Sequence, residues 1–183
     1  MFLGSDNVNE EKLIIRKVNS NDSYEWIKLV NKVWREAYYH IFPEEVFIEK
    51  EKNIDKKLEM FPERIKNDDQ NIAYVVEVDG KIIGIMCGSI NSRYKHFENE
   101  YADLNAIYID PKYQGKGIGS SFKKIFESWA KEHGATKYII GVLKENKKAR
   151  KIYESWGGKL ADYDSDFIKF DVRYTEVFYL YDL

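Results

Sequence analysis

The chain has little of the residue types that build disulfide-linked folds and metal sites. It contains a single cysteine, Cys87, so no disulfide can form within the chain, which agrees with a protein of the reducing cytoplasm. Cys87 lies in an apolar run, residues 82–90, and we expect a small buried hydrophobic residue there rather than a catalytic thiol. The three histidines are scattered singly, without the spacing of metal ligands, so no metal site is expected.

Neither the charge balance nor the apolar segments indicate a nucleic-acid or membrane partner. The 29 Lys and Arg residues nearly balance the 31 Asp and Glu residues, which leaves a net charge of −2. No overall field therefore attracts nucleic acid or an anionic membrane. No uninterrupted apolar stretch approaches the length needed to cross a bilayer, and the N-terminus lacks the pattern of a signal peptide. We expect a cytoplasmic protein with no nucleic-acid partner and no membrane partner.

The first third of the chain predicts one strand followed by helices. No linker or repeat divides the 183 residues, so a single domain over residues 1–183 is expected, with the polar residues 1–10 frayed. Asn21-Asp22-Ser23 is predicted to cap a helix whose apolar residues recur every three or four positions up to Tyr38. Pro43 is predicted to start a second helix, and Pro62 to break the charged helical stretch that follows.

The remainder predicts strands in hairpins and then a strand–helix–strand unit. Asp79-Gly80 is the dipeptide most typical of a two-residue hairpin turn, and apolar runs flank it. In the fourth predicted strand, residues 101–109, simple alternation places Asp103 and Ile107 on one face. These elements indicate an α/β (α+β) fold: a mixed, mostly antiparallel twisted sheet of about seven strands with flanking helices.

A glycine-rich loop, residues 114–120, joins the fourth strand to a helix. Such a loop aims unpaired backbone N–H groups at one point and adds the positive end of a helix dipole, which suits a phosphate group. A P-loop would need Lys-Ser or Lys-Thr after its second glycine, where this chain offers Ser120-Ser121. The dinucleotide fingerprint would need a glycine where Ser120 stands. We infer a pyrophosphate cradle of another kind.

Three motifs in order identify a resemblance. Gln114-Gly115-Lys116-Gly117-Ile118-Gly119 resembles the Gln/Arg-x-x-Gly-x-Gly/Ala signature of the GNAT superfamily of acetyl-CoA-dependent N-acetyltransferases. Asn146, Ala149 and Tyr153, followed by Trp156-Gly157-Gly158, are similar to the family's Asn-x-x-Ala-x-x-x-Tyr segment with its closing glycine. The stretch before the loop, residues 103–109, resembles the family's fourth strand. The similar block runs from Tyr101 to Leu160.

This resemblance implies a fold, a cosubstrate and a site. The fourth and fifth strands of the GNAT-like sheet would splay apart and admit the pantetheine arm of acetyl-CoA, with the fourth strand pairing to it as to another strand. Tyr153 corresponds to the general acid that protonates the departing thiolate. Asp103 stands where many relatives carry the glutamate that deprotonates the amine, and Asn146 either caps its helix or hydrogen-bonds the cofactor. The implied cofactor-binding residues are Ile107, Tyr108, Ile109, Gln114, Gly115, Lys116, Gly117, Ile118, Gly119, Ser120, Asn146 and Tyr153.

The acceptor is implied only as a small-molecule or peptide amine. Aromatic side chains of the first two helices would attract a cation through cation–π contacts, and acidic residues near Asp164 would recruit it. Two other functions stay open: a domain that binds acetyl-CoA without catalysis, and an acyltransferase that uses another acyl-CoA. A homodimer is an alternative to a monomer. The aromatic candidates are Trp26, Trp34, Tyr38, Tyr39, Phe42 and Phe47.

Overall fold

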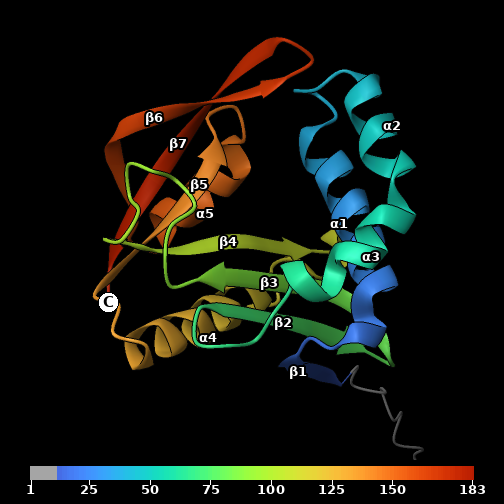
Figure 1. Ribbon diagram of the computed structural model, residues 1–183, viewed down its shortest axis with the longest axis horizontal. Coiled ribbons are helices and arrows are strands. Elements are labelled where there is room, and N and C mark those ends of the chain that lie inside the picture. Colours follow the sequence, from blue (N-terminus) through green and yellow to red (C-terminus); the bar gives the residue numbers. More distant parts are fainter. Residues whose placement is uncertain (1–11) are drawn as a thin grey trace, which may run out of the picture.

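Seven strands form one sheet in the order β1-β2-β3-β4-β5-β7-β6 (Figure 1). The computed structural model describes residues 12–183, so the segment expected to be frayed, residues 1–10, lies outside the described part. Neighbouring strands are antiparallel except β4 and β5, which are parallel. The predicted mixed, mostly antiparallel sheet is therefore confirmed. The strands are β1 Leu13–Lys17, β2 Asn71–Val78, β3 Lys81–Ser89, β4 Ala102–Ile109, β5 Lys137–Leu143, β6 Lys159–Lys169 and β7 Val172–Asp182.

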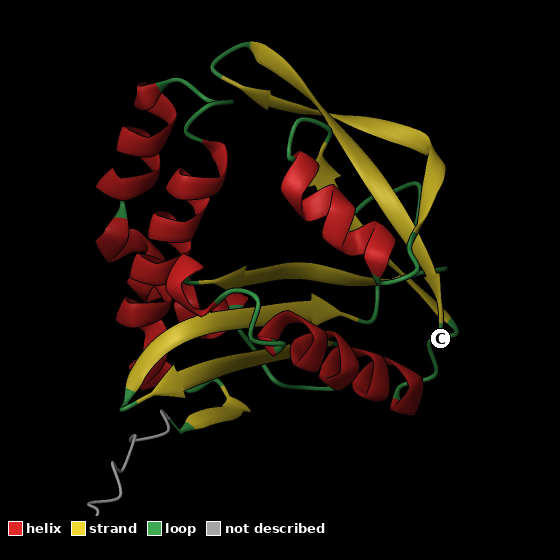
Figure 2. Cartoon of the chain, turned by 180° about the vertical axis from the view of Figure 1, so that it is seen from behind, coloured by secondary structure: helices red, strands yellow, loops and turns green. Residues whose placement is uncertain are grey.

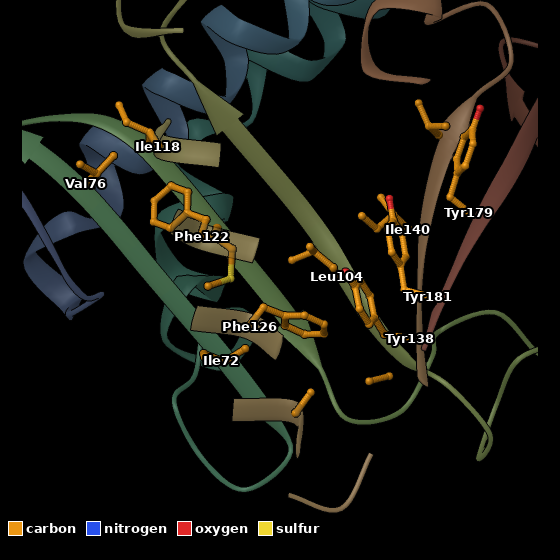
Figure 3. Close-up of a cluster of buried hydrophobic side chains, with 14 of the residues drawn as sticks. Ile72, Val76, Leu104, Ile118, Phe122, Phe126, Tyr138, Ile140, Tyr179 and Tyr181 are labelled. Atoms are coloured by element: carbon orange, nitrogen blue, oxygen red, sulfur yellow. The ribbon is translucent and has the colours of Figure 1, made fainter. Parts of the chain in front are cut away.

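Helices cover both faces of this sheet (Figure 2). Phe122 and Phe126 of α4 are fully buried against β2, β3 and β4 on one face (Figure 3). Trp26 of α1 and Phe61 of α3 belong to a second buried cluster on the other face. The helices are α1 Ser23–Tyr38, α2 Glu44–Lys52, α3 Ile54–Arg64, α4 Ile118–Glu132 and α5 Lys147–Ser155, with 3-10 turns at Ser20–Asp22 and Pro111–Tyr113.

The predicted cap of α1 is confirmed in position, because Asp22 is its N-cap residue, but no side chain makes a capping hydrogen bond to α1. The capping bonds lie at the 3-10 turn before it: the Asn19 side chain accepts a hydrogen bond from the Asn21 N–H, and the Asp22 carboxylate accepts one from the Asn19 N–H. This reciprocal pair is a capping box on a short 3-10 turn that leads into α1. Asp22 also binds Arg16 of β1 at 2.8 Å, so the cap fastens α1 to the sheet.

The predicted break at Pro62 is wrong. The charged helical stretch is interrupted at Asn53, whose φ of −107° and ψ of 43° lie outside the helical region, and Pro62 lies inside α3. The burial of Phe61 of α3 against Trp26 of α1 offsets the hydrogen bond that proline cannot make to the preceding turn. Pro43 is the residue before α2 rather than its first residue.

The β2–β3 turn follows the prediction. Asp79 and Gly80 form the two-residue connection, with φ values of 49° and 76°. Positive φ at both positions is what a type I′ turn requires, and aspartate followed by glycine adopts it at low cost.

An extra residue in β4 overturns the predicted alternation of that strand. Cys87 of β3 pairs with Ala106, whereas Ser89 pairs with Asp103, so β4 has one residue more than β3 between these pairs. Such a β-bulge reverses the faces beyond it. Leu104 and Ile107 accordingly contact the cluster under α4, while Ala106 and Tyr108 contact the cluster under α1. Asp103 and Ile107 therefore do not share a face.

The fourth and fifth strands splay apart as the resemblance implies. β4 and β5 pair only at Ala102 with Tyr138 and at Asp103 with Ile139. Beyond Asp103 the two strands diverge (Figure 1), and within residues 12–183 the β5 side of residues 104–109 has no strand partner. The sheet thus contains an internal free edge, which starts where the bulge lies.

Candidate active site

A cleft of about 1490 Å³ opens where β4 and β5 diverge. The end of α1, the last residues of β4, the glycine loop and α5 line it, together with Tyr174 of β7. Lys116, by contrast, is not among the lining residues and places its ammonium group 5.0 Å from the centre of the Tyr113 ring. The predicted cofactor residues that do line the cleft are Ile107, Tyr108, Ile109, Gln114, Gly115, Gly117, Ile118, Gly119, Ser120, Asn146 and Tyr153.

The loop before α4 has the open geometry that an anion requires. Gly115 and Gly117 adopt φ values of +79° and +81°, and a Cβ atom built on either would meet nothing within 4 Å. Gly117 is the N-cap of α4, where no side chain accepts a capping hydrogen bond, and the first turn holds no acidic residue. The amides at the start of α4 are thus left for an anionic ligand.

Two polar contacts hold this loop in place. The Gln114 side-chain amide donates to the Ile109 carbonyl at 3.0 Å, and its oxygen accepts a hydrogen bond from Lys148 of α5 at 2.7 Å. Gln114 thus ties the glycine loop to both β4 and α5. The role of Lys148 in this link was not expected from the sequence.

Asp110, the residue after β4, also helps to hold the start of the glycine loop in place. Its carboxylate accepts hydrogen bonds from the ammonium group of Lys32 in α1 at 2.7 Å and from the backbone N–H of Lys112 at 3.1 Å. Burial acts to raise the pKa of Asp110, but the bonds from Lys32 and Lys112 outweigh it and lower that pKa. Sequence reasoning missed the contact of Lys32 with Asp110, because the two residues are 78 positions apart.

Tyrosines surround the inner end of the cleft. Burial raises the pKa of Tyr153, and the neighbouring Tyr38 raises it further. Burial also raises the pKa of Tyr108 well above its ordinary value, with Tyr38 and Tyr153 adding to the effect. All three hydroxyls therefore stay protonated at neutral pH.

Asn146 acts as the predicted cap of α5, since its side chain accepts a hydrogen bond from the Ala149 N–H at 3.1 Å.

Asp103 lies outside the cleft lining, at the vertex where β4 and β5 part. Its side chain is fully buried, with the Nε atom of Arg93 3.8 Å from Oδ2. Arg93 donates to the Tyr94 hydroxyl at 2.9 Å, and that hydroxyl donates to Oε1 of Glu176 at 2.7 Å. Burial raises the pKa of Asp103 to about 6, against the partial compensation of Arg93. No sequence pattern indicated Arg93 or Glu176, because Arg93 lies in a polar loop and Glu176 in an alternating strand.

Removing the Asp103 charge should change how stability depends on pH. The pKa of about 6 in the folded state exceeds the ordinary 3.8, so the fold favours the neutral form. The stabilisation from this preference is complete below pH ~4 and is lost as pH rises through ~6, with a total of about 3 kcal/mol. We expect the free energy of unfolding of Asp103→Asn, minus that of the wild type, to increase over this window.

Urea unfolding of both proteins in matched buffers would measure that difference. Asp162→Asn, at an exposed position of β6, is the control and should show no such trend. If the free energy of unfolding of Asp103→Asn differs from that of the wild type by a constant amount between pH 4 and 7, burial does not raise the pKa of Asp103.

The predicted aromatic acceptor pocket is only partly present. Of the six aromatic candidates, Tyr38 alone lines the cleft. Trp26, Phe42 and Phe47 are buried in the core, and Tyr39 is 69% exposed.

Within the described residues, no helix has the length and apolar character of a membrane span. No group of three or more His, Cys, Asp or Glu side chains in residues 12–183 is placed to hold a metal ion.

The sequence model of the Acetyltransferase (GNAT) family matches residues 27–158. The chain belongs to this family. The match contains the glycine loop and Tyr153, so all the elements that line the cleft except β7 lie within the matched residues.

Curated relatives and solved structures agree with this membership. An uncharacterized N-acetyltransferase of Methanocaldococcus jannaschii is 27% identical over 145 residues, which are 78% of this chain and 59% of the relative. The chain thus spans about three fifths of that relative's length. Thialysine N-epsilon-acetyltransferase of Sus scrofa is 38% identical over 56 residues, 31% of this chain and 33% of that protein.

Among solved structures, the PaiA N-acetyltransferase of Thermoplasma acidophilum in complex with coenzyme A has the same fold. Its TM-score is 0.69 at 20% sequence identity, over 94% of this chain and 99% of that chain. A GNAT-family acetyltransferase of Streptococcus pneumoniae gives the same values. The shared fold agrees with the splayed fourth and fifth strands described above.

Proposed function

We propose that this GNAT-family protein transfers the acetyl group of acetyl-CoA to a primary amine, with both substrates bound at once. One observation carries the proposal: a single cleft joins an anion-binding loop to the free edge of β4 and to a buried tyrosine. The relatives named as N-acetyltransferases support the reaction class, and the thialysine enzyme supports an amine as acceptor.

The residues present fit acetyl-CoA from its phosphates to its thioester. The amides around Gly117 and Gly119 would hold the pyrophosphate, because no Cβ obstructs the loop and no side chain caps the helix. The unpaired backbone of residues 107–109 would bind the pantetheine amides as an added strand would. When bound, acetyl-CoA supplies an acetyl group already activated as a thioester.

Side chains at the inner end would then handle the protons. Tyr153 lines the cleft with its hydroxyl protonated, so we assign it the donation of a proton to the departing thiolate. A backbone N–H of β4 would hydrogen-bond the carbonyl oxygen. We assign Asp103 the amine's proton, which must travel through a bridging group because the carboxylate is fully buried. Holding both substrates in one cleft supplies much of the rate enhancement.

Cys87 is not expected to take part. Burial raises the pKa of its thiol to about 12, so the nucleophilic thiolate is scarce at neutral pH. It also lies outside the cleft lining. We expect Cys87→Ala to keep the wild-type rate of thiol release from acetyl-CoA in the presence of an amine. A folded variant with lost turnover would instead point to an acetyl-cysteine route.

Thermal unfolding with acetyl-CoA tests the proposal directly. Ligand at about a hundred times its Kd stabilises the fold by roughly 2.7 kcal/mol, or about 5–10 °C for a chain of this size. We expect this rise with acetyl-CoA, and none with NAD or ATP at the same concentration. No rise in folded protein free of carried-over CoA would overturn the proposal. A rise without turnover on any amine would indicate a domain that binds acetyl-CoA without catalysis.

A further inference from the structure

A polar cluster lies beside the inner end of the cleft, and Asp103 is the only member of it that the sequence motifs contain. It consists of Arg93 and Tyr94 from the β3–β4 loop, Asp103 from β4 and Glu176 from β7, joined by the contacts described above. Two carboxylates in this cluster accompany one guanidinium. A cation from solution would bring the cluster to charge balance.

Glu176 is the carboxylate that a ligand can reach. Asp103 is fully buried, whereas Glu176 is only partly buried. Its Oε1 accepts the hydrogen bond from Tyr94, and within residues 12–183 no buried side-chain oxygen lacks a partner. No hydrogen bond to the second oxygen, Oε2, is found in the described part, so this oxygen is not fully buried. It is therefore available to a donor.

The position of Glu176 relates this oxygen to the cleft. Alternation along β7 places it on the same face as Tyr174, which lines the cleft, and Phe178, which is buried below. Burial raises the pKa of Tyr38, another lining residue, and the nearby charge of Glu176 raises it further. Glu176 itself is not among the residues that line the cleft, but its charge acts on Tyr38, which is. The cluster is also open to solvent on the side of Arg93, whose side chain is 49% exposed.

We propose that Glu176 binds the ammonium group of a cationic acceptor, so that this protein selects alkylamines over amines that are uncharged at neutral pH. This inference rests on the proposed acetyl transfer. The ammonium would donate to Oε2 of Glu176, beside the cleft that takes acetyl-CoA. Asp103 contributes a second negative charge to the same cluster, and the tyrosine ring of Tyr38 or Tyr174 offers a cation–π surface.

Glu176→Gln tests the charge while it keeps the shape. A glutamine can still accept the hydrogen bond from Tyr94, so the cluster keeps its geometry. Loss of a charge-assisted hydrogen bond should raise KM for a cationic amine about 10- to 100-fold, with KM for acetyl-CoA unchanged. Thiol release would be measured with lysine, thialysine and spermidine as cationic probes, and with an arylamine as the uncharged probe. Glu98→Gln, at an exposed position of the same β3–β4 loop, is the control and should match the wild type.

The outcomes separate this inference from the proposed function. A higher KM for the cationic probes alone, with the arylamine rate unchanged, supports it. An unchanged KM for the cationic probes overturns it, and so does a wild type that acetylates only the arylamine, while both results leave acetyl transfer intact. Absence of stabilisation by acetyl-CoA, or of turnover on every probe, would overturn the proposed function and this inference together.

Discussion

Replacing Tyr153 with phenylalanine is expected to lower kcat on the order of 100-fold and to leave acetyl-CoA affinity unchanged. The substitution removes one hydroxyl from the inner end of the cleft but keeps the ring. The centre of this ring lies 5.7 Å from the ring centre of Trp156 and 5.9 Å from that of Tyr179. Because burial and Tyr38 raise the pKa of Tyr153, its hydroxyl carries a proton throughout the neutral range, as a general acid must. Loss of that proton donor affects the chemical step and not the binding of the cosubstrate.

Steady-state kinetics with saturating amine, together with calorimetric titration of acetyl-CoA, would measure both quantities. Tyr24→Phe is the matched control, because Tyr24 is an exposed tyrosine of α1 and 49% of its surface is accessible. If Tyr153→Phe keeps its kcat from pH 6 to 9, the thiolate leaves without help from Tyr153. That result would remove the residue from the mechanism and would leave the family membership as it is.

Gly117→Ala is expected to weaken acetyl-CoA binding by at least roughly tenfold. Gly117 is the N-cap of α4 at a φ of +81°, a conformation that costs a residue with a Cβ about 1–2 kcal/mol. The open space around its Cα is where the loop amides would meet the pyrophosphate. A methyl group there obstructs the phosphate, and relief of the backbone strain would turn the amides away from it. A loss of 1.4 kcal/mol in binding is already a factor of ten.

Gly134→Ala separates this effect from loss of stability. Gly134 follows α4 at its other end, has a φ of +86°, and also has no atom within 4 Å of a built Cβ. The two substitutions should therefore lower the unfolding temperature by similar amounts, and only Gly117→Ala should change the Kd for acetyl-CoA. Equal Kd values for both variants would mean that this loop does not hold the pyrophosphate.

Features set by neighbouring residues followed from the sequence. The Asp79-Gly80 turn, the open glycine loop before α4 and the Asn146 cap of α5 each depend on residues within a few positions of one another. Local dihedral preference and one or two short hydrogen bonds decide such structures. The prediction at Pro62 failed for the opposite reason. Proline disfavours a helix locally, but the packing of Phe61 on Trp26, 35 positions away, keeps α3 in place.

The β4 bulge shows where reading along one strand is insufficient. Strict alternation gave Asp103 and Ile107 one face, but β4 pairs with β3 through one additional residue. Gly88 lies opposite that residue, where a Cβ would come within 2.4 Å of the Phe126 ring and 2.9 Å of the Asp103 carbonyl. A glycine in a strand is compatible with a bulge and with other close contacts, so the register had to come from the packed sheet.

The sequence by itself determined the family, the glycine loop, the order of the strands and helices, and Tyr153 as a residue of the cleft. Tertiary structure alone decided that Lys32 binds Asp110, that Asp103 is buried at the vertex of β4 and β5, and that Glu176 lies beside it. Tyr94 and Glu176 are 82 positions apart and meet because the β3–β4 loop packs against β7, where the Tyr94 ring lies 4.6 Å from that of Phe178. A sequence motif reveals a function only when the residues that perform it are close together in the sequence. The charge at the proposed acceptor site depends on side chains that are distant in the sequence, and only folding brings those together.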